Sequence, residues 1–279
     1  MDRGHREALG QGRLVLRVQG RPGPPPLRFE TAGRARMLLR QGERVLLLGR
    51  ADGEGCCRDL ALHRLDGYRS PLPPIRSALA RDPGNWPHRY ASWLEESTGT
   101  PLHDGRWQLG ERRAFPPYVW GNEEFVRDWP GGSLALYCGG GWNGVLPLRR
   151  LSAPDAPRVK AYRKQAADGT LAPVLLWWVA FLDGWLLLDG HDRAVAALAE
   201  GRTPPCVVLT RVADDEVWRR EFTAITEGTP HTRHMTPAYG DTLAGLPYEP
   251  AGTRTWPLPG GAPAWEDLAG QAVFQYPRD

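Results

Sequence analysis

Five consecutive residues, Asp189-Gly190-His191-Asp192-Arg193, combine side chains of acid–base chemistry with side chains that bind phosphate. Glycine lets the backbone turn sharply and approach a ligand closely. A guanidinium donates paired hydrogen bonds to phosphate oxygens, and a histidine either donates to such an oxygen or transfers a proton. The pattern therefore predicts a phosphate or nucleotide site at Gly190, His191, Asp192 and Arg193, with His191 and Asp189 as the candidate catalytic groups.

The residues around this pentapeptide predict a strand that runs directly into a helix. The apolar run 171–190 divides at Asp183-Gly184, a dipeptide typical of hairpin turns, which favours two buried strands over a membrane helix. HDRAVAALAE (191–200) predicts a helix that ends at Gly201. The first N–H groups of a helix have no partner within it, and they attract anions. The same turn also occurs in purely structural roles, which is the alternative interpretation.

Further elements occur around the pentapeptide in a recognisable order. They are a strand VLPLRRL (145–151), a helix RVKAYRKQAADG (158–169), the start of a strand in DGTLAPVLL (168–176), and a last strand PPCVVLTRV (204–212). Together with the strand and helix at 186–201, they resemble the ParB/sulfiredoxin-like superfamily over residues 145–212. The resemblance implies an α+β unit with a small mixed sheet and helices.

Within that superfamily, the Asp-Gly-His-x-Arg form is similar to that of the free-serine kinase branch. Asp189, Gly190, His191 and Arg193 match it, whereas the variable position, often Thr or His, is Asp192. A carboxylate there repels a bound phosphate unless a cation intervenes, although it also suits the start of a helix. The ParB partition branch has Gly-Glu-Arg-Arg at this place. Sulfiredoxin chemistry needs a cysteine directly after the glycine, where this chain has His191, so sulfinic-acid reduction is disfavoured.

The resemblance implies binding of a nucleotide or phosphorylated small molecule, with ATP, ADP or CTP and Mg²⁺ as the expected cofactors. A kinase, another small-molecule phosphotransferase or a nucleotide hydrolase would then be the enzyme class. Phosphoryl transfer also needs a base near the acceptor hydroxyl, usually a carboxylate. Asp155, Asp168 and Asp189 are the candidates, and the first two are more typical of a loop and a helix end.

The composition of the chain limits which partners and which cellular compartment we expect. The 279 residues carry a net charge of +3, with 24% charged and 41% hydrophobic residues, as expected for a folded globular protein. Of the 35 basic residues only Lys160 and Lys164 are lysines, and the arginines accompany 33 Gly and 27 Pro, as GC-rich codon usage would produce. No apolar run reaches 18 residues, and the N-terminal MDRGHREALGQGR lacks the apolar region of a secretory signal, so we expect neither a membrane span nor a secretory signal. We expect a bacterial-type cytoplasmic protein with reduced thiols and no membrane partner.

No residue group predicts a metal site. The four cysteines lack metal-ligand spacing: Cys56, Cys57, Cys138 and Cys206. His231 and His234 have an i, i+3 spacing, but flanking prolines favour a surface loop. Gly139-Gly140-Gly141 lacks the Lys-Ser/Thr of a phosphate-binding P-loop, so a junction between domains is favoured.

The chain is expected to divide into three parts. Residues 1–143 form a Trp-rich mixed α and β region of unknown fold, residues 144–212 the ParB/sulfiredoxin-like unit, and residues 213–279 a helix with a loop-rich extension. Within them we expect strands at 13–20 and 43–50, a short helix in 31–41, and helices at 88–98, 214–227 and 264–274. The 12 tryptophans favour core packing, with an aromatic ligand platform as the alternative.

Three functions stay open at this stage. The first is a nucleotide- or phosphate-ester-binding enzyme with the site described above. The second is a non-catalytic binding or regulatory module whose Trp-rich region holds a protein partner. The third is a ParB-type nucleic-acid-associated protein, which the near-neutral net charge and the lack of a basic helix-turn-helix pattern weaken.

Overall fold

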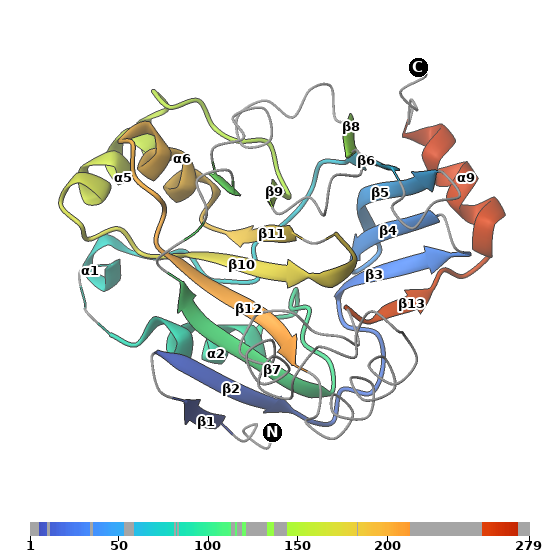
Figure 1. Ribbon diagram of the computed structural model, residues 1–279, viewed down its shortest axis with the longest axis horizontal. Coiled ribbons are helices and arrows are strands. Elements are labelled where there is room, and N and C mark those ends of the chain that lie inside the picture. Colours follow the sequence, from blue (N-terminus) through green and yellow to red (C-terminus); the bar gives the residue numbers. More distant parts are fainter. Residues whose placement is uncertain are drawn as a thin grey trace, which may run out of the picture.

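Two mixed β-sheets and the helices that cover them make up an α+β fold, as the sequence predicts (Figure 1). The computed structural model describes residues 6–9, 12–33, 36–52, 59–80, 82, 84–112, 115, 119–120, 133–136, 144–182, 184–212 and 253–272. The predicted helix at 214–227, both candidate metal histidines, the Gly-Gly-Gly segment and three of the four cysteines lie outside these residues. None of the described helices is long and apolar enough to cross a membrane.

The first sheet has seven strands and carries the candidate site at one end. Its order is β1 (Arg6–Leu9), β2 (Arg13–Val18), β7 (Gly105–Arg112), β12 (Cys206–Val212), β10 (Val174–Val179), β11 (Gly184–Asp189) and β9 (Val145–Pro147). The neighbours β10 and β12 are parallel, as are β11 and β9, whereas the other pairs are antiparallel. The sheet is therefore mixed.

The second sheet is largely a meander of antiparallel strands. Its order is β13 (Thr255–Pro257), β3 (Leu27–Ala32), β4 (Arg36–Gln41), β5 (Arg44–Asp52), β6 (Asp59–Arg64) and β8 (Ser133–Leu136), with β13 parallel to β3. The short helix predicted for 31–41 is wrong. Met37 and Leu39 pack into the main core while Leu38 packs on the opposite face, and this alternation of period two belongs to a strand.

Five α-helices and one 3₁₀ segment are described. They are α1 (Ser77–Ala80), α2 (Trp86–Glu96), α5 (Pro157–Ala167), the 3₁₀ segment η2 (Ala180–Leu182), α6 (His191–Ala199) and α9 (Gly261–Gln271). The helices predicted at 88–98, 158–169, 191–200 and 264–274 are confirmed. Helices α5 and α6 pack together beside the ends of β10 and β11 (Figure 1).

The three predicted parts share their sheets. Strand β7, from the first part, pairs with β12 from Arg106↔Val212 to Arg112↔Cys206. Strand β13, from the last part, pairs with β3, and Trp265 of α9 donates to the backbone oxygen of Met37 at 2.8 Å. The expected boundaries at 143/144 and 212/213 therefore do not divide the sheets.

The predicted hairpin of two buried strands is confirmed, with a longer connection than a two-residue turn. Strands β10 and β11 pair antiparallel from Val179↔Gly184 onward, and η2 lies between them. Gly184 therefore begins β11 rather than completing the turn. The strand expected at 145–151 is shorter, since β9 ends at Pro147, and proline cannot donate to a strand ladder.

Candidate functional site

The predicted passage from strand to helix is confirmed at Gly190. Strand β11 ends at Asp189 and α6 begins at His191, while Gly190 between them has φ 90° and ψ 26°. This left-handed conformation favours glycine. A Cβ atom added there would lie 2.8 Å from Arg193 Nη2 and 2.8 Å from Val174 Cγ1. Both the backbone conformation and the close packing thus require glycine.

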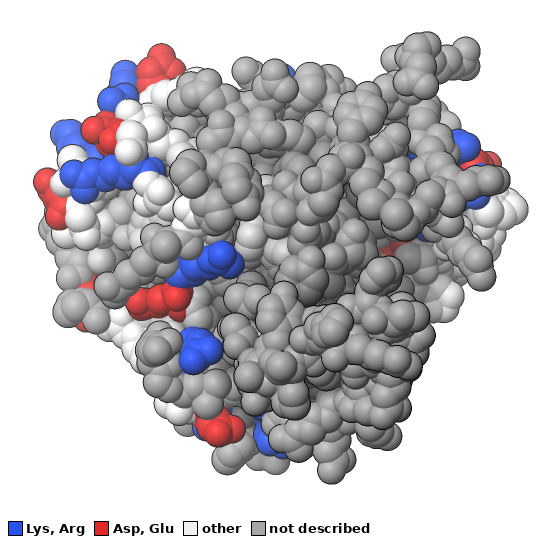
Figure 2. Space-filling view, in the orientation of Figure 1, with Lys and Arg blue, Asp and Glu red and all other residues white. Residues whose placement is uncertain are grey.

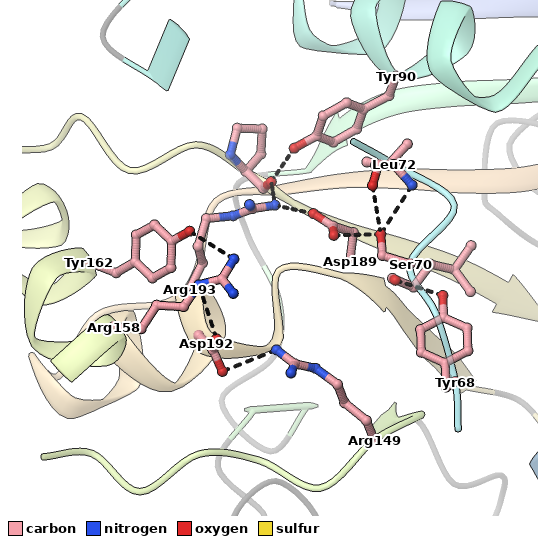
Figure 3. Close-up of polar contacts among 12 residues, drawn as sticks. Tyr68, Ser70, Leu72, Tyr90, Arg149, Arg158, Tyr162, Asp189, Asp192 and Arg193 are labelled. Carbon is pink, nitrogen blue, oxygen red and sulfur yellow. Dashed lines mark hydrogen bonds and ion pairs between the residues drawn. The ribbon is translucent and has the colours of Figure 1, made fainter. Parts of the chain in front are cut away.

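A pocket of about 220 Å³ lies at the N-terminus of α6. All five residues of the predicted pentapeptide line it. Four further lining residues follow β6 in the chain: Tyr68, Ser70, Leu72 and Pro74. Another three lie between β9 and the end of α5: Arg149, Arg158 and Tyr162. The pocket therefore combines segments far apart in the sequence (Figure 3).

Arg193 lies inside the protein and holds the end of β11 (Figure 3). Its Nη2 donates to Asp189 Oδ2 at 2.6 Å and to the backbone oxygen of Pro173 at 3.0 Å. Tyr90 donates to the same Pro173 oxygen. Burial is the largest effect and lowers the pKa of the Arg193 guanidinium, but the Asp189 carboxylate together with Tyr90 and Tyr162 raises it, and the net pKa lies above the ordinary value. The arginine thus remains charged and fixes Asp189.

The second oxygen of Asp189 meets a hydroxyl from a distant segment. Ser70 Oγ donates to Asp189 Oδ1 at 2.6 Å, and the Leu72 N–H donates to Ser70 Oγ at 3.1 Å. The segment is anchored two residues earlier, where the buried Tyr68 hydroxyl donates to the backbone oxygen of Leu188 at 2.6 Å. Both carboxylate oxygens of Asp189 therefore accept a hydrogen bond.

Asp192 lies in the first turn of α6 and has cationic partners. Ser152 Oγ donates to its Oδ1 at 2.9 Å, Arg149 Nη2 lies 3.1 Å from Oδ1, and Arg158 Nε lies 3.4 Å from Oδ2. The carboxylate is buried, whereas the side chains of Arg149 and Arg158 are 42% and 64% exposed. The charge that would repel a phosphate is thus compensated by two arginines at the pocket rim.

His191 is buried, with 2% of its surface exposed, and its ring lies 6.0 Å from that of Tyr68, centroid to centroid. Burial lowers its pKa well below the ordinary value, and the positive charges of Arg149, Arg64 and Arg193 lower it further. The imidazole is therefore neutral at pH 7. Its Nε2 is buried without a hydrogen-bond partner among the described residues, which leaves one polar atom for a ligand.

The other candidate bases lie away from the pocket. Asp168 follows the last turn of α5, where its backbone N–H donates to Lys164 O at 3.0 Å, and Asp155 is exposed before α5. Neither lines the pocket. Among the three candidate carboxylates, Asp189 is the one that the fold places at the pocket.

Cys206 has no access to this chemistry. It is buried at the start of β12, where its Sγ donates to the backbone oxygen of Pro204 at 3.1 Å. Burial raises the pKa of the thiol well above its ordinary value, and a thiol rather than a thiolate is a poor nucleophile. Cys206, the cysteine among the described residues, is thus poorly suited to act as a reactive thiol.

Sequence reasoning did not single out Ser70, Arg149 or Arg158. For the two arginines a signal exists, because Arg149 follows β9 and Arg158 begins α5, and such positions meet at the edge of a sheet. Ser70 gives no signal, because it lies 119 residues from its partner Asp189.

Comparison with known proteins gives no match from which a function could be inferred, so the geometry of the pocket is the basis for the proposal below. No family model matches the chain, and no match was found among the curated proteins or the solved structures.

Proposed function

We propose that the chain binds the phosphate end of a nucleotide, or of another phosphorylated small molecule, at the N-terminus of α6, and that it is a ParB/sulfiredoxin-like phosphotransferase. One observation carries this proposal. The buried His191, whose Nε2 has no hydrogen-bond partner among the described residues, lines a pocket at a helix N-terminus whose rim carries Arg149 and Arg158.

The charges around the pocket favour an anion. Three arginines and two carboxylates line it, and the neutral His191 adds no charge. Asp189 is paired with Arg193, and Asp192 is shared by Arg149 and Arg158. One positive charge is therefore left over, and the helix N-terminus adds a partial positive charge. Phosphate oxygens are suitable partners for both.

The size of the pocket suits a small group. Pockets that enclose drug-sized ligands measure roughly 300–1,000 Å³, whereas this one measures about 220 Å³. It therefore fits the phosphates of a nucleotide, with the base and ribose outside, or a small phosphate ester.

Mg²⁺, which commonly accompanies nucleotide phosphates, would meet the carboxylates of Asp189 and Asp192 here. Proteins usually hold this ion through one or two carboxylates together with the substrate's phosphates. The described part of the chain has no group of three or more His, Cys, Asp or Glu side chains that could hold a metal by itself. The pocket therefore fits Mg²⁺ that arrives bound to a nucleotide. The ion would neutralise part of the negative charge of the phosphates.

Thermal unfolding with ATP, ADP or CTP, with and without Mg²⁺, tests the proposal. A ligand at a hundred times its Kd stabilises a protein by about 2.7 kcal/mol, which raises the Tm of a chain this size by about 5 °C. Arg158→Ala should weaken the affinity at least about tenfold, because hydrogen bonds to charged groups contribute roughly 1.5–3 kcal/mol. Arg163→Ala is the matched control, since Arg163 also lies on α5 but pairs with Glu200. Equal loss in both variants, or no shift with any nucleotide, would exclude the site.

The alternative of a nucleic-acid partner has one observation in its favour. Helix α5 carries four basic residues and no acidic one: Arg158, Lys160, Arg163 and Lys164. Figure 2, however, shows Lys and Arg interspersed with Asp and Glu over α5 and α6, and backbone binding needs clustered basic side chains. Salt-sensitive retention on DNA, with no nucleotide shift, would favour this alternative. For the protein-partner alternative, most described tryptophans are buried in the cores, which favours packing.

A further inference from the structure

The contact between Ser70 and Asp189 has the geometry of a nucleophile and its base. Ser70 is exposed and lines the pocket, and its Oγ donates to Asp189 Oδ1 at 2.6 Å. Arg193 holds the other carboxylate oxygen at 2.6 Å. A hydroxyl, an adjacent base and a third group that orients the base are the parts of an activated nucleophile.

Contacts of the two preceding residues anchor the segment that carries the Ser70 hydroxyl. Tyr68 is bound to the Leu188 oxygen, and Arg69 exchanges two hydrogen bonds with Gln41, at 2.8 and 3.0 Å. The segment is thus anchored without the Ser70 side chain. The hydroxyl is therefore held beside Asp189, and such fixed placement lowers the entropic part of the barrier.

We propose that Ser70 is a phosphoacceptor: its hydroxyl takes a phosphoryl group from a nucleoside triphosphate bound in the pocket, and a phosphoserine enzyme results. This inference rests on the proposed function, since it needs phosphates at the N-terminus of α6. The bond between Ser70 Oγ and the γ-phosphorus forms, and the bond from that phosphorus to the β–γ bridging oxygen breaks. Asp189 takes the hydroxyl proton, and the nucleoside diphosphate leaves with the bonding electron pair.

The acid–base groups of the pocket favour a phosphoanhydride as the donor. The neutral, buried His191 is a poor acid, and the Tyr68 hydroxyl already donates to Leu188. Burial also raises the pKa of Tyr68 well above its ordinary value. His191 and Tyr68 are thus poor acids for an alkoxide leaving group. A nucleoside diphosphate leaves as a stable anion and needs no proton.

The pair of Asp189 with Arg193 is compatible with this role. Phosphoryl transfer passes through a loose transition state that depends chiefly on positioning and charge, and Arg193 positions the Asp189 carboxylate. Once Asp189 has taken the proton, it no longer repels the phosphoserine. Figure 3 shows Ser70 and Asp189 above Arg149 and Asp192, so the hydroxyl of Ser70 and the guanidinium of Arg149 come from different segments around the pocket.

Intact-mass measurement of the full-length protein incubated with ATP and Mg²⁺ tests the inference, followed by peptide mapping. We expect one added phosphoryl group, located on Ser70. Ser70→Ala should abolish it, and Asp189→Asn should slow it by roughly a hundredfold or more, as for loss of a general base. Ser152→Ala is the matched control, because Ser152 donates to the neighbouring carboxylate of Asp192 but does not line the pocket. It should retain the modification.

The outcomes distinguish phosphorylation of Ser70 from nucleotide binding at the N-terminus of α6. A nucleotide-induced Tm shift without phosphoserine, or with phosphate on another residue, overturns the role of Ser70 and leaves the binding site in place. Absence of both overturns both. A contaminating kinase would modify Ser70 equally in Asp189→Asn, and that result also overturns the inference. Ser70→Thr, which keeps a hydroxyl, should retain a slower reaction if Ser70→Ala unfolds.

Discussion

Arg193 and Asp189 form an ion pair across the turn at Gly190, with Nη2 2.6 Å from Oδ2. The pair joins the last residue of β11 to the first turn of α6, and it also reaches Pro173 just before β10 through Arg193. Because Arg193 is buried, removal of either partner leaves a charge without compensation. The turn that forms the pocket therefore depends on this contact.

Loss of one partner of the ion pair should lower the free energy of unfolding far more than replacement of both partners by apolar side chains. Arg193→Ala should lower the free energy of unfolding by about 3–5 kcal/mol, since one partner of a buried pair remains charged. The double variant Arg193→Met with Asp189→Leu should lose much less stability than the losses of the single variants Arg193→Met and Asp189→Leu added together. Denaturant titration of the parent protein, these two single variants and the double variant measures this coupling. Additive costs would show that the pair is not coupled.

Gly190→Ala should destabilise the protein more than Gly201→Ala. Both glycines have a positive φ, 90° and 65°, so each substitution carries a strain of about 1–2 kcal/mol. At Gly190 the new methyl group also meets Arg193 and Val174 at 2.8 Å, whereas nothing lies within 4 Å at Gly201. Urea unfolding gives both costs, and equal costs would mean that the close packing at Gly190 relaxes freely.

The protein should lose stability as the pH falls from about 6.5 towards 4. Burial lowers the pKa of His103 to about 4 and that of His191 well below its usual value. The unfolded chain therefore binds more protons than the folded one in this window, and stability rises with pH. Each histidine contributes at most about 1.4 kcal/mol per pH unit. The contribution is complete above the unfolded pKa and declines until the folded pKa is reached.

Denaturant unfolding at several pH values measures this dependence. His103→Gln should flatten the slope, because it removes one of the three described histidines whose pKa is lowered by burial, the others being His63 and His191. An equal slope in this variant and in the parent protein would assign the acid sensitivity elsewhere.

Tyr68→Phe should cost more than Tyr90→Phe. Both hydroxyls are buried and donate to backbone oxygens, those of Leu188 and Pro173. When the Tyr90 hydroxyl is removed, the Pro173 oxygen still accepts a hydrogen bond from Arg193. Loss of the Tyr68 hydroxyl should cost about 1–3 kcal/mol and should also weaken nucleotide binding, because it anchors the segment with Ser70. Thermal unfolding with and without ATP measures both effects, and an unchanged ATP shift would contradict the second.

Predictions from the sequence were most accurate where a local pattern has one structural solution. The apolar run before Asp189 and the alanine-rich segment after Gly190 predicted β11 and α6, and the structure has them at 184–189 and 191–199. The pattern was insufficient for 31–41, where a hairpin with Gly33 in its turn replaces the expected helix. There the pairing of β3 with β13 and the packing of α9 against Met37 also decide the structure, and both contacts join residues far apart in the sequence.

The sequence by itself determined the glycine turn, the helix behind it and the side chains of the pentapeptide, because all of these depend on residues close together in the chain. Tertiary structure decided the partners. Asp189 contacts Ser70, which follows β6 in the chain. Asp192 contacts Arg149, which follows β9, and Arg158, which lies in the first turn of α5. The fold brings these three segments together at one end of the first sheet. Such contacts arise from strand pairing and burial over long sequence separations, which short-range patterns do not specify.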